Sequence, residues 1–238
     1  CAVWHLKDDG EWNAGLMPSC SAGLLNGVAY GNGRFVAVGE TSTGAGCGLW
    51  TSTDGMSWSS VACPATMAKP LGSIAFNPAT NTFAAGGYCE VPAGVSYNVI
   101  RSADGFSWAS GATITIGGPC VGTDKVHSMS ASASGGETFV AINTWGGNFS
   151  ISTNNGASYA NAPNTLSVTA PTRLFRGGSS RVIGTGQSAG SPASSYTDDN
   201  GGTPFSASVL TGFAGTSGFV LASTGPNSVV GLADNCGL

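Results

Sequence analysis

The chain has 238 residues, of which 41% are hydrophobic, enough for a large core. Charged residues make up only 8%, against about 25% in an ordinary soluble domain. Because Lys and Arg together number 8 and the net charge is −4, there is no basic patch for phosphates, and we expect no nucleic-acid partner. No apolar run approaches the roughly 20 residues of a transmembrane helix, so we expect none.

A pair of strands joined by a tight turn recurs along the chain. The first copy runs from Gly27 to Val38, and Gly31-Asn32-Gly33 supplies the positive φ angles of its turn. Later copies occupy 74–85, 129–142, 174–183 and 219–232. The equivalent positions are about 50 residues apart, which indicates a repeat architecture: Phe35, Phe83, Phe139, Val182 and Val229.

A second hairpin with a polar turn follows the first in each repeat. Leu49 to Trp58 ends in Ser-Thr-Asp-Gly-Met-Ser-Trp, and Ile100 to Trp108 matches it. Ser152 to Tyr159 is a third copy and 196–205 a degraded fourth. Val3 to Trp12 has the same order with one residue deleted. Short Asx and Ser side chains hydrogen-bond their own turn, Gly takes the left-handed position, and the aromatic packs between sheets.

These hairpins resemble the Asp boxes of sialidase-type (BNR) propeller repeats. The resemblance implies an all-β fold, a five-bladed β-propeller of four-stranded antiparallel blades in one domain, 1–238. The expected units are 24–62, 71–112, 126–162, 171–208, and 219–236 completed by 1–15. The N-terminal hairpin is thus expected to close the last blade. Trp4, Trp50 and Ile100 share one strand position and are expected to pack between blades.

Seven Cys residues in a chain rich in Gly, Ser and Thr suggest an extracellular or cell-surface setting. Cysteines before the third strand and after the fourth strand of a blade emerge on one face of the repeat. We therefore predict Cys47–Cys63, Cys89–Cys120 and Cys20–Cys236. Cys1 remains, and it is open whether it carries a lipid anchor, bridges another molecule or is a free thiol. Without Cys-x-x-Cys pairs, and with His5 and His127 far apart, no metal or other cofactor is expected.

By the same resemblance, Asp54, Asp104 and Asp199 are structural and lie opposite the face that carries active sites in sialidases. The other face collects residues that follow strand two or precede strand one, the latter being Asp124, Lys125 and His127 in the third repeat. Its candidate ligand-binding residues are Glu40, Glu90, Asn143, Gln187, Asp234 and His127. Trp145, in a Gly-rich loop, is a candidate for stacking on a sugar ring. The alternative is that these strand ends are polar without any ligand. Asn148 begins an N-glycosylation sequon, meaningful in a eukaryotic source.

Sialidase chemistry needs three Arg around the substrate, and the five Arg of this chain are too scattered to form such a triad. We therefore expect a non-catalytic secreted or cell-surface module for binding, adhesion or self-assembly into a filament or matrix. Its partners would be glycans or cell-surface components, or other copies contacting through Cys1 or blade faces. One alternative is a carbohydrate-binding, lectin-like propeller. Another is a glycoside hydrolase or lyase with Glu40 and Asp234 as its carboxylate pair.

Overall fold

The structure is a computed structural model that describes residues 3–6, 9–18, 23–41, 46–89, 96–115, 124–131, 139–143, 149–162, 169–177, 181–188, 191–197, 206–209, 219–225 and 228–233. The fold and site described below concern these residues. They form β-strands joined by turns and loops. In this part of the chain, no helix has the length and hydropathy that crossing a membrane requires.

Four antiparallel sheets of four strands each follow one another along the chain, each in simple up-and-down order. Sheet 1 contains β3 (Leu25–Gly31), β4 (Arg34–Glu40), β5 (Cys47–Ser52) and β6 (Ser59–Ser60). Sheet 2 contains β7 (Leu71–Asn77), β8 (Thr82–Cys89), β9 (Ser96–Ser102) and β10 (Ala109–Thr115). Sheet 3 contains β11 (Val126–Ala131), β12 (Phe139–Asn143), β13 (Phe149–Ser152) and β14 (Ala160–Asn161). Sheet 4 contains β15 (Thr169–Gly177), β16 (Arg181–Ser188), β17 (Ser191–Thr197) and β18 (Ser206–Val209).

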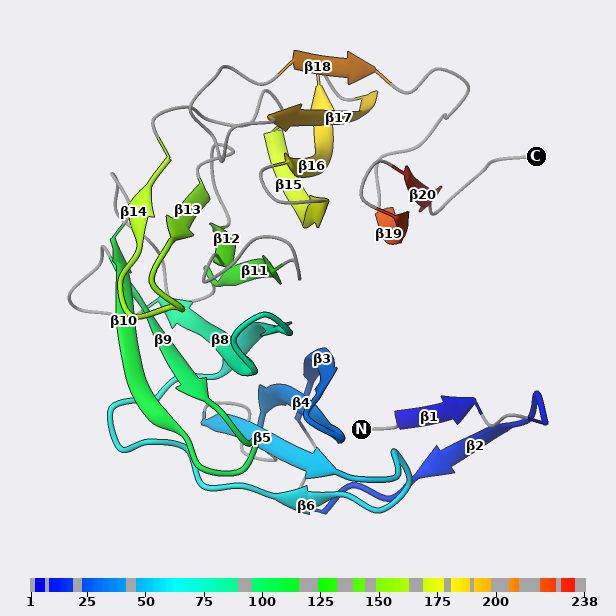
Figure 1. Cartoon of the computed structure of the whole chain (residues 1–238), viewed down its shortest axis with the longest axis vertical. Helices are drawn as coiled ribbons and strands as arrows, with labels where there is room; N and C mark the ends of the chain where they lie inside the picture. Colours follow the sequence, from blue (N-terminus) through cyan, green and yellow to red (C-terminus); the bar gives the residue numbers. More distant parts are fainter. Residues whose placement is uncertain are drawn as a thin grey trace.

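Two hairpins lie at the ends of this series. β1 (Val3–Leu6) pairs with β2 (Trp12–Gly15), and β19 (Phe219–Gly225) pairs with β20 (Ser228–Ala233). Figure 1 shows the four sheets along an arc, with β1–β2 beyond sheet 1 and β19–β20 beyond sheet 4.

Among the described residues the two end hairpins are separate two-stranded sheets, so β1–β2 does not pair with β19–β20 as the expected closure of the last blade requires. Each end hairpin contacts the sheet next to it in the chain. The N–H of Leu16 donates to the carbonyl of Met56, and the N–H of Trp58 donates to the carbonyl of Leu16, which fixes β1–β2 to sheet 1. β19 packs instead on β15 of sheet 4.

The residues expected to pack between blades fall into two groups. Trp50 and Ile100 are 2% and 1% exposed, as expected. Trp4, at the same repeat position, is 59% exposed, so the expectation is wrong for this residue.

Sheets 1 and 2 are apolar on both faces, because consecutive residues of a strand point to opposite sides and their inner strands carry runs of apolar residues. In β4, Val36 and Val38 are 1% and 0% exposed and pack with Ile74 and Phe83 of sheet 2. Ala37, between them, packs instead with residues of the β1–β2 hairpin. β8 repeats the pattern, since its Phe83 faces sheet 1 and its Ala84 faces sheet 3. The sheets therefore stabilise one another across successive interfaces.

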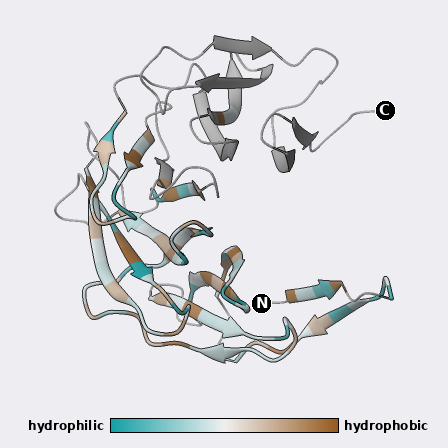
Figure 2. Cartoon of the chain, viewed as in Figure 1, coloured by the Kyte–Doolittle hydropathy of each residue, from teal (hydrophilic) through white to brown (hydrophobic). Residues whose placement is uncertain are grey.

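The ring packing inside these interfaces repeats from sheet to sheet. Phe35 lies 4.6 Å from the ring of Tyr30 and 6.4 Å from that of Trp58. Phe83 has the same two neighbours at the same distances, Phe76 at 4.6 Å and Trp108 at 6.4 Å. In Figure 2, strongly apolar segments lie on β3, β4, β9 and β13. The internal repeat expected from the sequence is therefore present in three dimensions.

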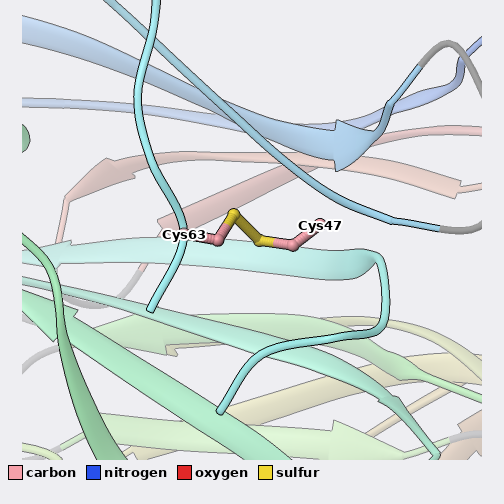
Figure 3. The surroundings of a disulfide bond; sticks show 2 residues. All are labelled: Cys47 and Cys63. Carbon is pink, nitrogen blue, oxygen red and sulfur yellow. A yellow bond between two sulfur atoms is a disulfide. The ribbon is translucent and has the colours of Figure 1, made fainter. Parts of the chain in front are cut away.

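A disulfide joins Cys47, at the start of β5, to Cys63, after β6, with 6.3 Å between the two Cα atoms (Figure 3). It is the pair expected for this repeat. For a sequence separation of 16, loop-closure entropy stabilises the fold by about 3 kcal/mol. Cys89 is also disulfide-bonded. Its expected partner Cys120, the pair Cys20 and Cys236, and Cys1 lie outside the described residues.

The turn glycines allow a direct test of how tightly neighbouring sheets pack. Gly33 and Gly105 have nearly the same φ, +69° and +70°, but a Cβ at 33 would meet open space whereas one at 105 would lie 2.8 Å from Cγ2 of Val36. We expect Gly33→Ala to lower the free energy of unfolding by about 1–2 kcal/mol through backbone strain alone. Gly105→Ala should lose about 1–3 kcal/mol more, through overpacking against sheet 1. Urea unfolding measures both, and equal losses would contradict the described interface.

Candidate functional site

The antiparallel order of the sheets separates two ends of the molecule. Residues that begin the first strand and end the second strand of a sheet lie at one end, which we call the Glu40 end. The polar turns after the third strand lie at the opposite end, which we call the Asp-turn end. In sheet 1, for example, Leu25 pairs with Gly39 next to Glu40, whereas Asp54 follows β5 two residues after Ser52.

At the Asp-turn end, Asp54 organises its own turn. Its Oδ1 accepts hydrogen bonds from the N–H groups of Met56 and Ser57, both at 2.8 Å, and from the Ser52 hydroxyl. The Ser52 oxygen accepts the N–H of Gly55, which has a φ of +74°. These bonds explain why the sequence places Ser, Asp and Gly at this spacing.

The same network recurs in two more turns. Asp104 accepts hydrogen bonds from the N–H groups of Phe106 and Ser107 and from the Ser102 hydroxyl. In the third copy Asn154 takes the same place and accepts the N–H of Ser158 and the hydroxyl of Ser152. The amide oxygen thus accepts the same kinds of hydrogen bond as the carboxylate, without its charge.

Hydrogen bonding to the ionised form sets the acidity of these groups. The amides of Ser57 and Met56, followed by the Ser52 hydroxyl, lower the pKa of Asp54 to about 2. Burial raises the pKa of Asp104, but the amides of Ser107 and Phe106 outweigh it and hold this pKa well below its ordinary value. These carboxylates are turn-forming acceptors and stay ionised at neutral pH, unlike a general acid.

At the Glu40 end, four polar side chains from three sheets form one hydrogen-bonded cluster. The Tyr88 hydroxyl donates to Oε1 of Glu40 at 3.1 Å and accepts from Nζ of Lys125 at 3.3 Å. Nζ of Lys125 also donates to Oδ1 of Asn26 at 3.1 Å, and Asn26 donates to the carbonyl of Leu71 at 2.8 Å. We call Asn26, Glu40, Tyr88 and Lys125 the polar cluster.

The polar cluster holds a carboxylate and an ammonium group on either side of one phenol. Burial, followed by the hydrogen bond to Glu40 and the charge of Glu40, raises the pKa of Tyr88, so its hydroxyl stays protonated and remains a donor. Nζ of Lys125 also lies 5.3 Å from the centre of the Tyr88 ring, within the range of a cation–π contact. A ligand at this end would meet both signs of charge in a fixed geometry.

The structure places several of the predicted residues at the Glu40 end. Asn143 ends β12 opposite Val126, and Gln187 lies near the end of β16 opposite Thr169. His127 is half-buried at a register irregularity near the start of β11. Of these candidates, only Glu40 takes part in the polar cluster. Glu90, Trp145, Asp234 and Asp199 lie outside the described residues. In the described ranges, no three His, Cys, Asp or Glu side chains gather as metal ligands would.

Two members of the polar cluster were missed by the sequence reasoning. Tyr88 lies next to the end of β8, and Glu40 lies at the end of β4. Tyr88 was missed because an aromatic residue in a β-strand is ordinarily assigned to the core. Asn26 precedes the Gly27 that begins the recognised repeat. A search for polar residues at the equivalent ends of strands one and two in each repeat would have included both.

Several solved structures have an architecture similar to that of this chain. The chain superposes on YCF48 bound to a D1 peptide with a TM-score of 0.58 and 19% identity, covering 92% of this chain and 63% of that one. It also superposes on hydrazine synthase from Kuenenia stuttgartiensis, with a TM-score of 0.58 and 10% identity, covering 87% and 56%. The fold is a β-propeller. Sheets 1 to 4 are therefore blades 1 to 4.

A third solved structure, of a protein from Lactobacillus plantarum, superposes with a TM-score of 0.58 and 11% identity, covering 88% of this chain and 63% of that chain. This chain thus spans less than two thirds of the length of these propellers. No family model and no curated protein matches the sequence. The likeness is one of fold, and the site has to be argued from its own residues.

Replacing Tyr88 tests whether the polar cluster ties the blades together. Tyr88→Phe removes the hydroxyl that links Glu40 to Lys125, and we expect it to lower the free energy of unfolding by about 1–2 kcal/mol. Tyr30→Phe is the matched control, because Tyr30 is 57% exposed. Chemical denaturation measures both variants. Equal, negligible effects would show that the cluster contributes nothing to stability.

The low pKa of Asp54 predicts a particular loss of stability in acid. Because this pKa falls from 3.8 to about 2 on folding, the charged form stabilises the native state above pH 4, and the stabilisation disappears as the pH falls towards 2. Asp54→Asn should therefore have a lower urea midpoint than wild type at pH 7 and the same midpoint near pH 2. Asn154→Asp should show the reverse, a gain at pH 7 that vanishes in acid. A pH-independent difference for either variant would contradict this assignment.

Proposed function

We propose that this propeller is a non-catalytic binding module of a secreted or cell-surface protein, and that its ligand contacts the Glu40 end. The observation that carries the proposal is the polar cluster, in which side chains from three blades present a carboxylate and an ammonium group at one end of the inner strands. Ligand sites made of a few fixed polar groups are commonly built where several elements converge.

The described carboxylates favour binding over hydrolysis. Asp54 and Asp104 are acceptors in their own turns, and Glu40 accepts the hydroxyl of Tyr88. A glycosidase needs a second carboxylate across the scissile bond. In the hydrolase alternative that residue is Asp234. The lectin alternative rests on Trp145 and its Gly-rich loop.

The structural frame of the proposal has five repeats. Blades 1 to 4 lie between two separate two-stranded sheets, β1–β2 and β19–β20. On the sequence pattern, we assign β19–β20 to the first half and β1–β2 to the second half of a fifth repeat. The turn networks of Asp54, Asp104 and Asn154 support a relationship to the Asp-box propellers. The disulfide of Cys47 and Cys63 suits an oxidising compartment.

A polypeptide segment is the first ligand class to test, because YCF48, a protein of similar fold, is bound to a peptide. On a peptide array, we expect the wild-type chain to select a subset of sequences. Glu40→Gln should weaken those complexes by about tenfold or more, or 1.4 kcal/mol. Asp9→Asn is the matched control, since the exposed Asp9 caps only the N–H of Glu11 in the β1–β2 turn.

Two further assays separate the alternatives. Hydrolysis of a polysaccharide panel by wild type, lost in Glu40→Gln, would overturn the non-catalytic assignment. Selective binding on a glycan array, lost in Trp145→Ala but not in Glu40→Gln, would favour the lectin alternative. Absence of any binding on both arrays would contradict the proposal.

A further inference from the structure

Asn-Gly pairs are places where a polypeptide can modify itself. The main-chain nitrogen of the glycine can attack the side-chain carbonyl carbon of the asparagine, because glycine has no Cβ to hinder the approach. The sequence has four such pairs: Asn26-Gly27, Asn32-Gly33, Asn155-Gly156 and Asn200-Gly201. The last pair lies outside the described residues. The other three differ in how firmly their reacting groups are held.

Asn155-Gly156 is held at both reacting groups. The side-chain oxygen of Asn155 accepts the hydroxyl of Thr80 at 2.6 Å, and its nitrogen donates to Oγ1 of Thr82 at 2.7 Å. The N–H of Gly156, whose nitrogen would have to attack, donates to the Ser152 hydroxyl at 2.8 Å. Gly156 itself is buried. Reaction at this pair would therefore break three hydrogen bonds in a packed part of the structure.

Asn26-Gly27 is held by the polar cluster and by its strand. The side-chain nitrogen of Asn26 donates to the carbonyl of Leu71 at 2.8 Å, and its oxygen accepts from Nζ of Lys125 at 3.1 Å. Gly27 lies within β3 and pairs with Val38 of β4. The two reacting groups can therefore meet only if the strand and the polar cluster are both disrupted.

Asn32-Gly33 forms the exposed tip of the turn between β3 and β4. Gly31 pairs with Arg34, and the two central residues have φ angles of +50° and +69°, as in a type I′ turn. Such a turn bonds its first residue to its fourth and leaves the N–H of the third, here Gly33, out of that bond. Both central residues are exposed, and a Cβ at position 33 would meet open space. The attacking nitrogen of this pair is therefore accessible to water.

The Asn32 side chain is held by its nitrogen, in contacts that are themselves exposed. Nδ2 donates to the carbonyl of Ala103 at 2.6 Å and to the carbonyl of Asn81 at 3.3 Å. Exposed turn tips open locally at a small free-energy cost. Such an opening releases Nδ2 and allows Cγ of Asn32 to meet the nitrogen of Gly33.

We propose that Asn32 is a self-modification site, at which the amide is converted to aspartate or isoaspartate through a succinimide. The nitrogen of Gly33 bonds to Cγ of Asn32, the Cγ–Nδ2 bond breaks, and ammonia leaves with the proton of the Gly33 N–H. Water then adds to one of the two imide carbonyl carbons and breaks the bond from that carbon to the nitrogen. Opening at Cγ gives aspartate, and opening at the main-chain carbon gives isoaspartate. In total, one water is consumed and one ammonia is released.

The modification would weaken the contact between blades 1 and 2. In the unmodified turn, an N–H donor of Asn32 faces the carbonyl oxygens of Ala103 and Asn81. A carboxylate offers only acceptors, so both hydrogen bonds would be lost and a negative charge would face two carbonyl oxygens. The residue after Ala103 is Asp104, which is also negative at neutral pH. All these groups lie at the Asp-turn end, so the inference does not rest on the ligand proposal.

Peptide mapping by mass spectrometry measures the reaction at each pair. Folded wild type is incubated in mildly alkaline buffer made with water labelled with heavy oxygen, which marks newly formed carboxylates, and a second sample is incubated in urea. In urea we expect the three pairs to react at similar rates. In the folded chain, Asn32 should react at least about tenfold faster than Asn26 or Asn155, because its turn opens most easily. Similar rates at the three pairs in the folded chain, or no reaction at Asn32, would overturn the proposal.

Two substitutions test the consequence for stability. Asn32→Asp and Asn32→Gly both remove the side-chain donor, and glycine tolerates the left-handed turn, but only the first places a charge against the carbonyl groups. We expect Asn32→Asp to have a lower urea midpoint than Asn32→Gly, which is the matched control. An Asn32→Asp midpoint equal to that of wild type would overturn the weakened contact. The mapping of wild type needs neither variant, so the modification site is tested even if one of them fails to fold.

Discussion

The packing of two-faced apolar sheets is the constraint on which this structure depends. Alternation along β4 and β8 makes both sides of each sheet apolar, so that a blade is stable only between two neighbours. Val36 and Phe83 are buried for this reason, and Gly105 is needed where one blade approaches the next. Among the described residues, most of the exposed large apolar side chains lie between Trp4 and Tyr30, on the side of sheet 1 away from sheet 2.

The polar side chains at the two ends of the blades make different kinds of contact. At the Asp-turn end, Ser52 and Asp54 direct their polar atoms into their own turn, so these charges are already satisfied locally. At the Glu40 end, Tyr88 and Lys125 reach across blade boundaries. A side chain that bridges blades both fixes their relative position and places charge where the inner strands converge. This difference makes the Glu40 end the better candidate for a ligand.

Much of the fold could be predicted from the sequence, because residues that form the same turn or hairpin recur at the same positions of each repeat. The hairpins, the turn role of Asp54 and the Cys47–Cys63 pair each follow from residues at fixed positions in the unit. The members of the polar cluster could be listed from their repeat positions, but their contacts could not be predicted, because the cluster joins residues 99 apart, Asn26 and Lys125, whose proximity depends on how blades rotate about the centre. Closure by the N-terminal hairpin depends on the same rotation. The sequence pattern alone does not determine the angle between neighbouring blades.

The central claim is that the described sheets bury apolar side chains against one another. Hydroxyl-radical footprinting at a concentration where the chain is monomeric tests it most directly, using two residues of the same chemistry. Tyr30 is 57% exposed and Tyr97 0%, so we expect rapid modification of Tyr30 and strong protection of Tyr97. Modification of Tyr97 as fast as that of Tyr30 would contradict the account, since the side chains between sheets 2 and 3 would then be open to solvent.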